Sequence, residues 1–143
     1  MTDPRILVCG NRDWTHVPTI ARWMSRVAAM VNDYKFGSAV IVHGACGVRD
    51  DNGVAIKGAD VLADDLARRW GWIVDPYPAD WDRYRNQAGP IRNALMLDAG
   101  NPVIGIAFGL LHRNGRQTGT GDMVRRMNAR GVPVILVGRP EGA

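Results

Sequence analysis

The 143-residue sequence predicts one domain, residues 1–143, with an α/β fold in which helices cover both faces of a doubly wound sheet. The sheet is expected to be mainly parallel, with about five strands. Three observations predict this fold. Strand-like and helix-like segments alternate along the chain, and the strand-like segments are apolar throughout, which is typical of strands buried on both faces. The length and a hydrophobic content of 46% suit a single core.

In the first half of the chain, Arg5–Cys9 (RILVC) predicts a buried strand that stops at Gly10. Apolar residues at helical spacing between Ile20 and Val31 then predict a helix, with Pro18 tolerated in its first turn. Ala39–His43 (AVIVH) predicts the second strand, closed by Gly44. The polar stretch Val48–Lys57 (VRDDNGVAIK) predicts a surface loop.

In the second half, helical spacing predicts a helix over Ala59–Trp70, with Gly71 as its C-terminal stop. Shorter helices are expected at about Pro90–Leu97 and Gly121–Ala129. The remaining apolar segments predict the last three strands, which are Trp72–Asp75, Pro102–Phe108 and Val132–Val137.

Composition and charge narrow the functional class. The net charge is +4, but the basic residues are spread along the chain, which argues against a nucleic-acid groove. No apolar run reaches the roughly 20 residues that a membrane span needs. The N-terminus has no secretory pattern and only two cysteines occur, so we expect a cytoplasmic protein. No metal-ligand spacing is present, and we expect neither a metal nor a cofactor.

Ligands of doubly wound folds bind beyond the carboxyl ends of the strands, so the loops there are the candidate site. After the first strand, Gly10, Asn11 and Arg12 could hold a phosphate or a ribose, or form a polar turn in which Asp13 caps the next helix. After the second strand, Gly44 and Asp60 are candidates. Asp60 could bind a ribose hydroxyl, act as a base or cap its helix. His43 is expected to be a hydrogen-bonded structural residue.

Two turns rich in small residues, Ala88–Met96 and Gly119–Val124, precede predicted helices and favour an anion site, because free backbone N–H groups gather there. Arg92 is expected to bind phosphate, and Asn93 to position the ligand or brace the loop. Trp81, upstream, either stacks on a base or packs at the domain edge.

In the second turn, Gly119 permits close backbone approach and the Thr120 hydroxyl could bind phosphate. Asp122, in the first turn of the helix, could act as a general base or merely complement the helix dipole.

The motifs VCGNRDW, VHG, GAD, ADW, AGPIRNALM and GTGDMV follow one another in the order that resembles the YspA-like branch of the SLOG superfamily. That superfamily includes the Lonely Guy phosphoribohydrolases, often called lysine decarboxylase-like proteins. The resemblance covers Arg5 to Val137. It implies a Rossmann-like fold that binds nucleotides, often as a homodimer.

Residue by residue, Arg92 resembles the arginine of the phosphoribohydrolase RK motif, and Gly119 with Thr120 resembles the phosphate-binding end of PGGxGTxxE. Met123 stands where that motif has its acidic residue, and the PGG is absent. Asp122 lies one position away, about 100° around a helix.

The sequence therefore favours binding of a nucleotide or nucleotide-derived ligand, as a sensor or sequestering protein. An alternative is an N-glycosidic hydrolase of a nucleoside monophosphate, with Asp122 or Asp60 as tentative catalytic carboxylates. A third, less favoured, is single-stranded nucleic-acid binding.

Overall fold

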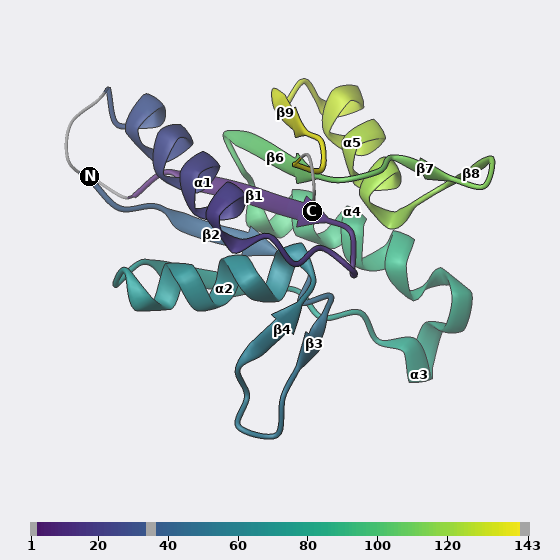
Figure 1. The fold of residues 1–143 in the computed structure, drawn as a ribbon. Helices are drawn as coiled ribbons and strands as arrows, with labels where there is room; N and C mark the ends of the chain where they lie inside the picture. The colour runs from purple at the N-terminus through teal and green to yellow at the C-terminus, as the bar shows by residue number, and fades with distance from the viewer. Residues whose placement is uncertain (1–2, 34–36, 141–143) are drawn as a thin grey trace.

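A computed structural model describes residues 3–33 and 37–140 of the chain. Its centre is a five-stranded, all-parallel sheet in the order β5-β2-β1-β6-β9 (Figure 1). The strands are β1 (Arg5–Gly10), β2 (Val40–His43), β5 (Ile73–Pro76), β6 (Ile104–Phe108) and β9 (Val134–Val137). The predicted doubly wound α/β fold is thereby confirmed.

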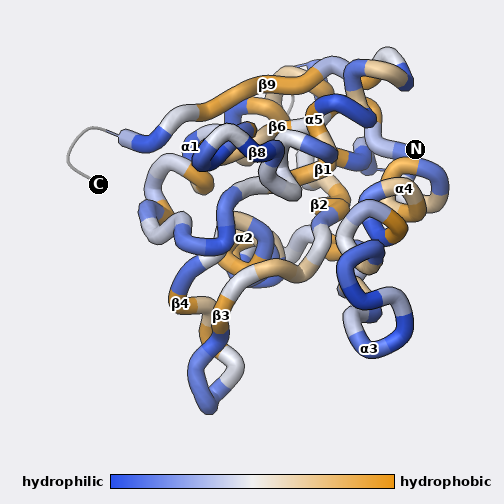
Figure 2. The backbone as a smooth tube through the Cα atoms, turned by 90° about the vertical axis from the view of Figure 1, so that its right-hand side faces the viewer, coloured by the Kyte–Doolittle hydropathy of each residue, from blue (hydrophilic) through white to orange (hydrophobic). Residues whose placement is uncertain are grey.

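Helices cover both faces of this sheet. The principal helices are α1 (Val17–Val31), α2 (Ala59–Arg69), α4 (Ala88–Gly100) and α5 (Gly119–Arg130). Alternate residues of β1 point to opposite faces, as the pleat requires. Ile6 and Val8 pack in the core beneath α1 and α2, whereas Leu7 and Cys9 pack with residues of α4 and α5. The tube of β9 is orange in Figure 2, which reflects the apolar sequence of this strand.

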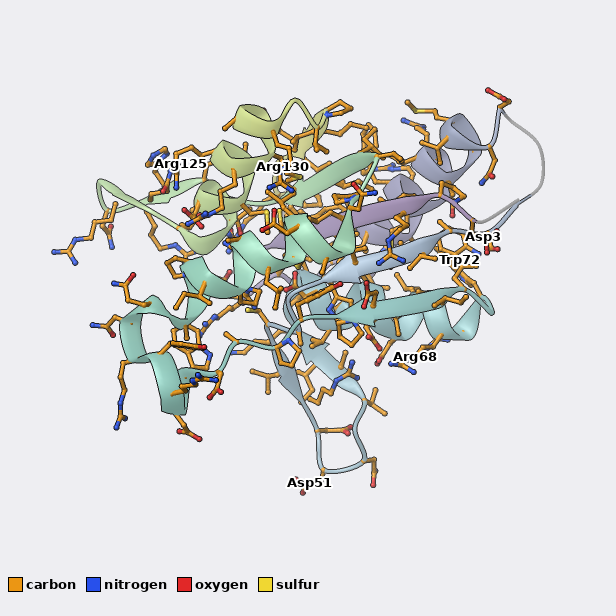
Figure 3. All side chains as sticks on the ribbon, turned by 180° about the vertical axis from the view of Figure 1, so that it is seen from behind. Asp3, Asp51, Arg68, Trp72, Arg125 and Arg130 are labelled. Carbon is orange, nitrogen blue, oxygen red and sulfur yellow. The ribbon has the colours of Figure 1, made fainter. Side chains whose placement is uncertain are left out.

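The predicted surface loop at Val48–Lys57 is in fact an exposed hairpin of β3 (Val48–Arg49) and β4 (Ala55–Lys57). It projects from the body of the molecule, and Asp51 marks its tip in Figure 3. Asp50 shapes its turn, because its side chain accepts the N–H groups of Asn52 and Val54. Two strands this short leave no periodicity for a sequence pattern to reveal.

Two further segments differ from the prediction. The chain before α4 forms a short helix, α3 (Trp81–Tyr84), and a 3₁₀ turn, η1 (Arg85–Gln87), so α4 begins at Ala88 and continues to Gly100. The loop after β6 carries a small hairpin of β7 (His112–Arg113) and β8 (Arg116–Gln117).

The chain adds strands first on one side of β1 and then on its other side. The chain proceeds from β1 outward to β2 and β5, then returns to place β6 and β9 on the other side. The loops after β1 and β6 therefore diverge, which opens a crevice at the carboxyl edge of the sheet.

Candidate functional site

A cavity of about 510 Å³ lies at this crevice. Every site residue predicted from the sequence lines it: Gly10, Asn11, Arg12, Gly44, Asp60, Trp81, Arg92, Asn93, Gly119, Thr120 and Asp122. Eight further residues line the cavity that were not singled out from the sequence as site residues, although several of them lie within the turns predicted there: Cys9, Cys46, Gly89, Pro90, Met96, Arg113, Gln117 and Thr118. Segments from both halves of the chain thus meet in one cavity.

Arg92, on α4, places a buried guanidinium in the cavity wall. Its Nε donates to Asn93 Oδ1 at 2.9 Å, and its Nη1 donates to the carbonyl of Gly44 at 2.5 Å. Nη1 and Nη2 lie 3.5 and 3.6 Å from the sulfur of Cys46. Within residues 3–33 and 37–140, no carboxylate lies within 4.0 Å of this guanidinium. A buried cation with no counter-ion favours an anion beside it.

The N-terminus of α5 opens into the same cavity. Thr118 is the N-cap, and its hydroxyl accepts the N–H of Gly121 at 3.0 Å. The N–H groups of Gly119 and Thr120 precede the first intrahelical hydrogen bond, which the N–H of Asp122 makes to the Thr118 carbonyl. A Cβ at Gly119 would meet no atom within 4 Å, so this turn is open. Such a helix start suits a phosphate or carboxylate.

The start of α4 differs from the expected anion-binding turn. Because η1 leads directly into α4, the N–H of Ala88 already donates to the carbonyl of Arg85. Pro90 has no N–H to offer. The first expected turn therefore contributes the side chains of Arg92 and Asn93 to the cavity, and not a set of free backbone donors.

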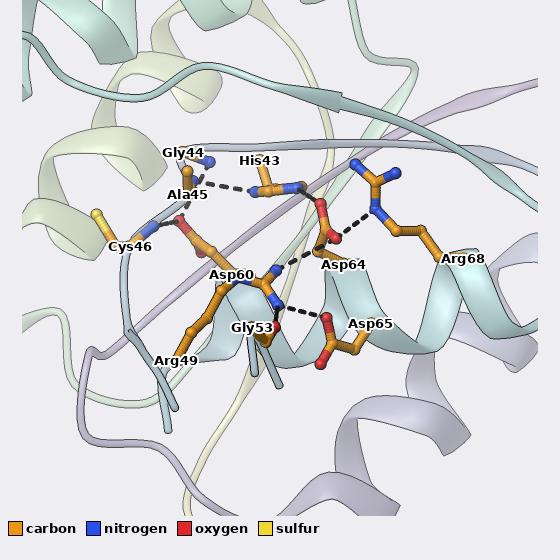
Figure 4. A network of polar contacts seen from close by, with 10 residues as sticks. All are labelled: His43, Gly44, Ala45, Cys46, Arg49, Gly53, Asp60, Asp64, Asp65 and Arg68. Atoms are coloured by element: carbon orange, nitrogen blue, oxygen red, sulfur yellow. Dashed lines mark hydrogen bonds and ion pairs between the residues drawn. The ribbon is translucent and has the colours of Figure 1, made fainter. Parts of the chain in front are cut away.

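Asp60, near the start of α2, is 4% exposed. Its Oδ2 accepts the N–H groups of Gly44 at 3.1 Å and Cys46 at 3.2 Å (Figure 4). Its Oδ1 is buried without a hydrogen-bond partner in the described structure. Burial raises the pKa of Asp60 above its usual value, despite the opposing influence of His43 and Arg92. Gly58 is the N-cap of α2, so the interpretation of Asp60 as a helix cap is wrong.

Two asparagines hold the walls of the cavity together. Asn11 donates to the carbonyl of Leu110 at 3.0 Å and to Thr120 Oγ1 at 3.4 Å, and its Oδ1 accepts the N–H of Leu110 at 2.7 Å. Asn93 donates to the Gly119 carbonyl at 3.3 Å and to Asp122 Oδ2 at 3.0 Å. Asn11 therefore braces the loop after β6, and Asn93 ties α4 to the start of α5.

Asp122 faces cations as well as the cavity. Arg125 and Arg126 each approach its carboxylate at 2.8 Å. Burial acts to raise the pKa of Asp122, but hydrogen bonds from Asn93, Arg126 and Arg125 outweigh it and lower that pKa. Asp122 is therefore ionised at neutral pH, and its low pKa makes it a weak base.

The rim of the cavity carries an aromatic ring. Trp81 is 46% exposed, and the guanidinium carbon of Arg12 lies 5.5 Å from its ring centroid. The loop after β1 differs from the expected turn in one respect: His16, and not Asp13, caps α1 by accepting the N–H of Thr19.

Gly10 and Gly44 allow two close approaches that build the cavity. A Cβ at Gly10 would lie 2.4 Å from Ala59 Cβ, so glycine lets the start of α2 contact the end of β1. A Cβ at Gly44 would lie 2.5 Å from Arg92 Nη1. Both glycines thus have packing roles that are independent of any ligand.

A second polar cluster lies one helical turn further along α2 (Figure 4). His43 Nε2 lies 2.6 Å from Asp64 Oδ2, and His43 Nδ1 accepts the N–H of Ala45 at 3.0 Å. Arg68 and Arg49 approach Asp64 Oδ1 at 2.7 and 3.3 Å. Although burial opposes it, hydrogen bonds from His43 and Arg68 lower the pKa of Asp64 to about 2. His43 is the hydrogen-bonded structural residue that the sequence predicted.

The described part of the chain holds no group of three or more His, Cys, Asp or Glu side chains that could bind a metal ion. None of the helices described is long and apolar enough to cross a membrane. Cys9 and Cys46 are both free thiols.

No family model matches the chain. Among curated proteins, it is similar to the Gene 61 protein of Mycobacterium phage D29, with 34% identity over 139 residues. The alignment covers 94% of this chain and 96% of the phage protein.

Proposed function

The chain belongs to the family of the Gene 61 protein of Mycobacterium phage D29, and we propose that it binds a nucleotide or nucleotide-derived ligand, as a sensor or sequestering protein. The observation that carries the proposal is the buried guanidinium of Arg92, which has no carboxylate partner among the described residues and shares a cavity with the start of α5. Membership of the YspA-like branch of the SLOG superfamily forms part of the same proposal.

The phosphate would bind between Arg92 and the N–H groups of Gly119 and Thr120. A guanidinium and a helix N-terminus both favour a phosphate dianion over a neutral ligand. The exposed ring of Trp81 offers a flat surface for a base at the rim. A cavity of about 510 Å³ falls in the range of roughly 300–1,000 Å³ typical of small-molecule sites.

Native mass spectrometry of protein purified from cells, followed by thermal shifts with a panel of nucleotides, tests the proposal. We expect a co-purified phosphorylated compound, or a rise in melting temperature with at least one nucleotide, because a ligand that binds only the folded state stabilises it. An empty protein that no member of the panel stabilises would contradict the proposal.

A second candidate is an N-glycosidic hydrolase acting on a nucleoside monophosphate, and the carboxylates favour it. The pKa of Asp60 is raised and that of Asp122 is lowered, although both line one cavity. Environments that separate two pKa values in this way are typical of acid–base pairs. Asp60 would donate a proton to the departing base, and ionised Asp122 would stabilise positive charge developing on the ribose. Water would add to the anomeric carbon as the bond to the base breaks, and its proton would return to the Asp60 carboxylate.

Incubation with nucleoside monophosphates, with chromatography for free base, separates the two candidates. Base release that is lost in both Asp60→Asn and Asp122→Asn would establish hydrolysis. Binding without base release would leave the sensor or sequestering role. The expected homodimer and the cytoplasmic location remain predictions, and light scattering tests the first.

A further inference from the structure

A second cavity, of about 530 Å³, adjoins the first. It lies between the loops after β1 and β2, the end of the β3–β4 hairpin and the segment before α3. Its walls include five residues that also line the first cavity, namely Arg12, Gly44, Cys46, Trp81 and Arg92. The two cavities therefore form one groove, with the Arg12–Trp81 pair and the Cys46–Arg92 pair where they meet.

The second cavity is electropositive. Its wall carries Arg12, Lys57 and Arg92, against the carboxylate of Asp13. Asp13 is already engaged, because Arg139 and Arg113 approach it at 2.8 and 3.5 Å. Hydrogen bonding from Arg139 is the main reason that the pKa of Asp13 is lowered.

The basic side chains of this cavity, in contrast, lack acidic partners. In the part of the chain that the structure describes, no ion pair involves Arg12, Lys57 or Arg92. Lys57 ends β4 and is held at the groove by the close contact of Gly58 with Gly47, where a Cβ at Gly58 would lie 2.5 Å from Gly47 Cα. The hairpin thus fixes the backbone of Lys57 beside the groove.

We propose that this second cavity is a subsite for a second anionic group, so that the ligand is a nucleoside diphosphate or a derivative of one. The inference rests on the proposed function, which assigns the first phosphate to Arg92 and the start of α5. The second phosphoryl group lies between Arg12 and Lys57. Each cavity alone has the volume of a complete small-molecule site, so the groove accommodates more than a nucleoside monophosphate.

Isothermal titration calorimetry with the mono- and diphosphates of the common nucleosides tests this assignment. For the base that binds, we expect the diphosphate to bind about tenfold or more tightly than the monophosphate, since one charge-assisted contact is worth at least about 1.4 kcal/mol. Lys57→Gln should abolish this difference and leave monophosphate affinity unchanged. Arg69→Gln is the matched control, because it removes one exposed charge at the far end of α2.

Equal affinity for the mono- and diphosphate, or a Lys57→Gln variant that retains the preference for the diphosphate, would overturn the second subsite and leave the proposed function standing. A loss of affinity for both ligands in Lys57→Gln would also overturn it, because the lysine would then serve the first phosphate. If neither class of nucleotide bound the wild-type protein, the proposed function and this inference would both fail.

Discussion

Asp60 and Asp64 lie one turn apart on α2, yet their surroundings are opposite. Both are 4% exposed. Asp64 has three cationic or imidazole partners, His43, Arg49 and Arg68, and both of its oxygens are used. Asp60 has two backbone partners on one oxygen and none on the other in the described structure.

The pKa values of the two carboxyls shift in opposite directions for this reason. The Asp64 cluster is complete within the protein, which indicates a structural role. The cluster of Asp60 and Arg92 leaves an oxygen and a guanidinium without ionic partners, which indicates a place for a ligand. The degree to which charges are paired therefore distinguishes a structural cluster from a candidate site at the same edge of one sheet.

The largest expected effect is a loss of folding stability when Asp64 is removed from its cluster with charged and imidazole partners. Asp64→Ala leaves His43, Arg49 and Arg68 without their shared acceptor, and loss of a buried partner of this kind costs about 3 kcal/mol. We expect urea unfolding to show such a loss. Asp98→Ala removes an exposed ion pair with Arg130 and should cost less than about 1 kcal/mol. Equal losses for the two variants would refute the structural assignment.

The next largest effect is a loss of nucleotide affinity when Arg92, which has no ionic partner among the described residues, is replaced. Arg92→Gln removes the buried cation, and we expect nucleotide affinity to fall about 30-fold, equivalent to about 2 kcal/mol. Stability should change by less than about 1 kcal/mol, because lost hydrogen bonds offset the relief of burying an unpaired charge. Calorimetric titration measures the first quantity and urea unfolding the second. If Arg92→Gln bound nucleotide as tightly as the wild type, Arg92 would not be part of the ligand site.

The pH dependence of stability should differ in sign between the two carboxyls. The folded-state pKa of Asp64 is about 2, below its unfolded value, so its stabilisation is present above about pH 4 and is lost as pH falls towards 2. The pKa of Asp60 is raised, so its favourable contribution is present at low pH and is lost as pH rises through its folded-state pKa.

Unfolding free energies of Asp64→Asn and Asp60→Asn across this pH range measure the difference. Relative to the wild type, Asp64→Asn should become less stable as pH rises from 2 to 4. Asp60→Asn should become relatively more stable as pH rises above about 4. Parallel pH profiles for the two variants would show that their environments do not differ as described.

The smallest effect separates the two threonines at the start of α5. Thr118 caps the helix, so Thr118→Ala should cost about 1 kcal/mol of stability, as measured by thermal unfolding. Thr120→Ala removes only a 3.4 Å contact with Asn11 and should cost less, while weakening nucleotide binding. A larger loss of stability in Thr120→Ala than in Thr118→Ala would show that Thr120, and not Thr118, caps the helix.

The sequence predicted the sheet well because buried parallel strands are apolar throughout, and because one glycine ends β1 and another follows β2. It also predicted most of the cavity wall, since residues after the strands of such a sheet converge at one edge. It missed the β3–β4 hairpin, whose exposed strands carry no apolar pattern. It also missed Thr118, because the start of α5 lies two residues earlier than expected.

The sequence could not predict which charged side chains have partners in the folded protein. Arg92 contacts Gly44, 48 residues away, and Asp60 accepts from Cys46 across 14 residues. Nothing in the local pattern distinguishes Asp60 from Asp64, which depend on tertiary neighbours for their opposite environments. The position of Cys46 just beyond β2 was the available signal for its place in the cavity.

Affinity and stability measured side by side for Arg92→Gln and Asp64→Ala test the central claim most directly. The claim predicts that Arg92→Gln loses nucleotide affinity and keeps its stability. Asp64→Ala should lose stability and, below its melting temperature, bind nucleotide as the wild type does. A loss of affinity in Asp64→Ala with none in Arg92→Gln would contradict the claim and move the ligand to the His43–Asp64 cluster.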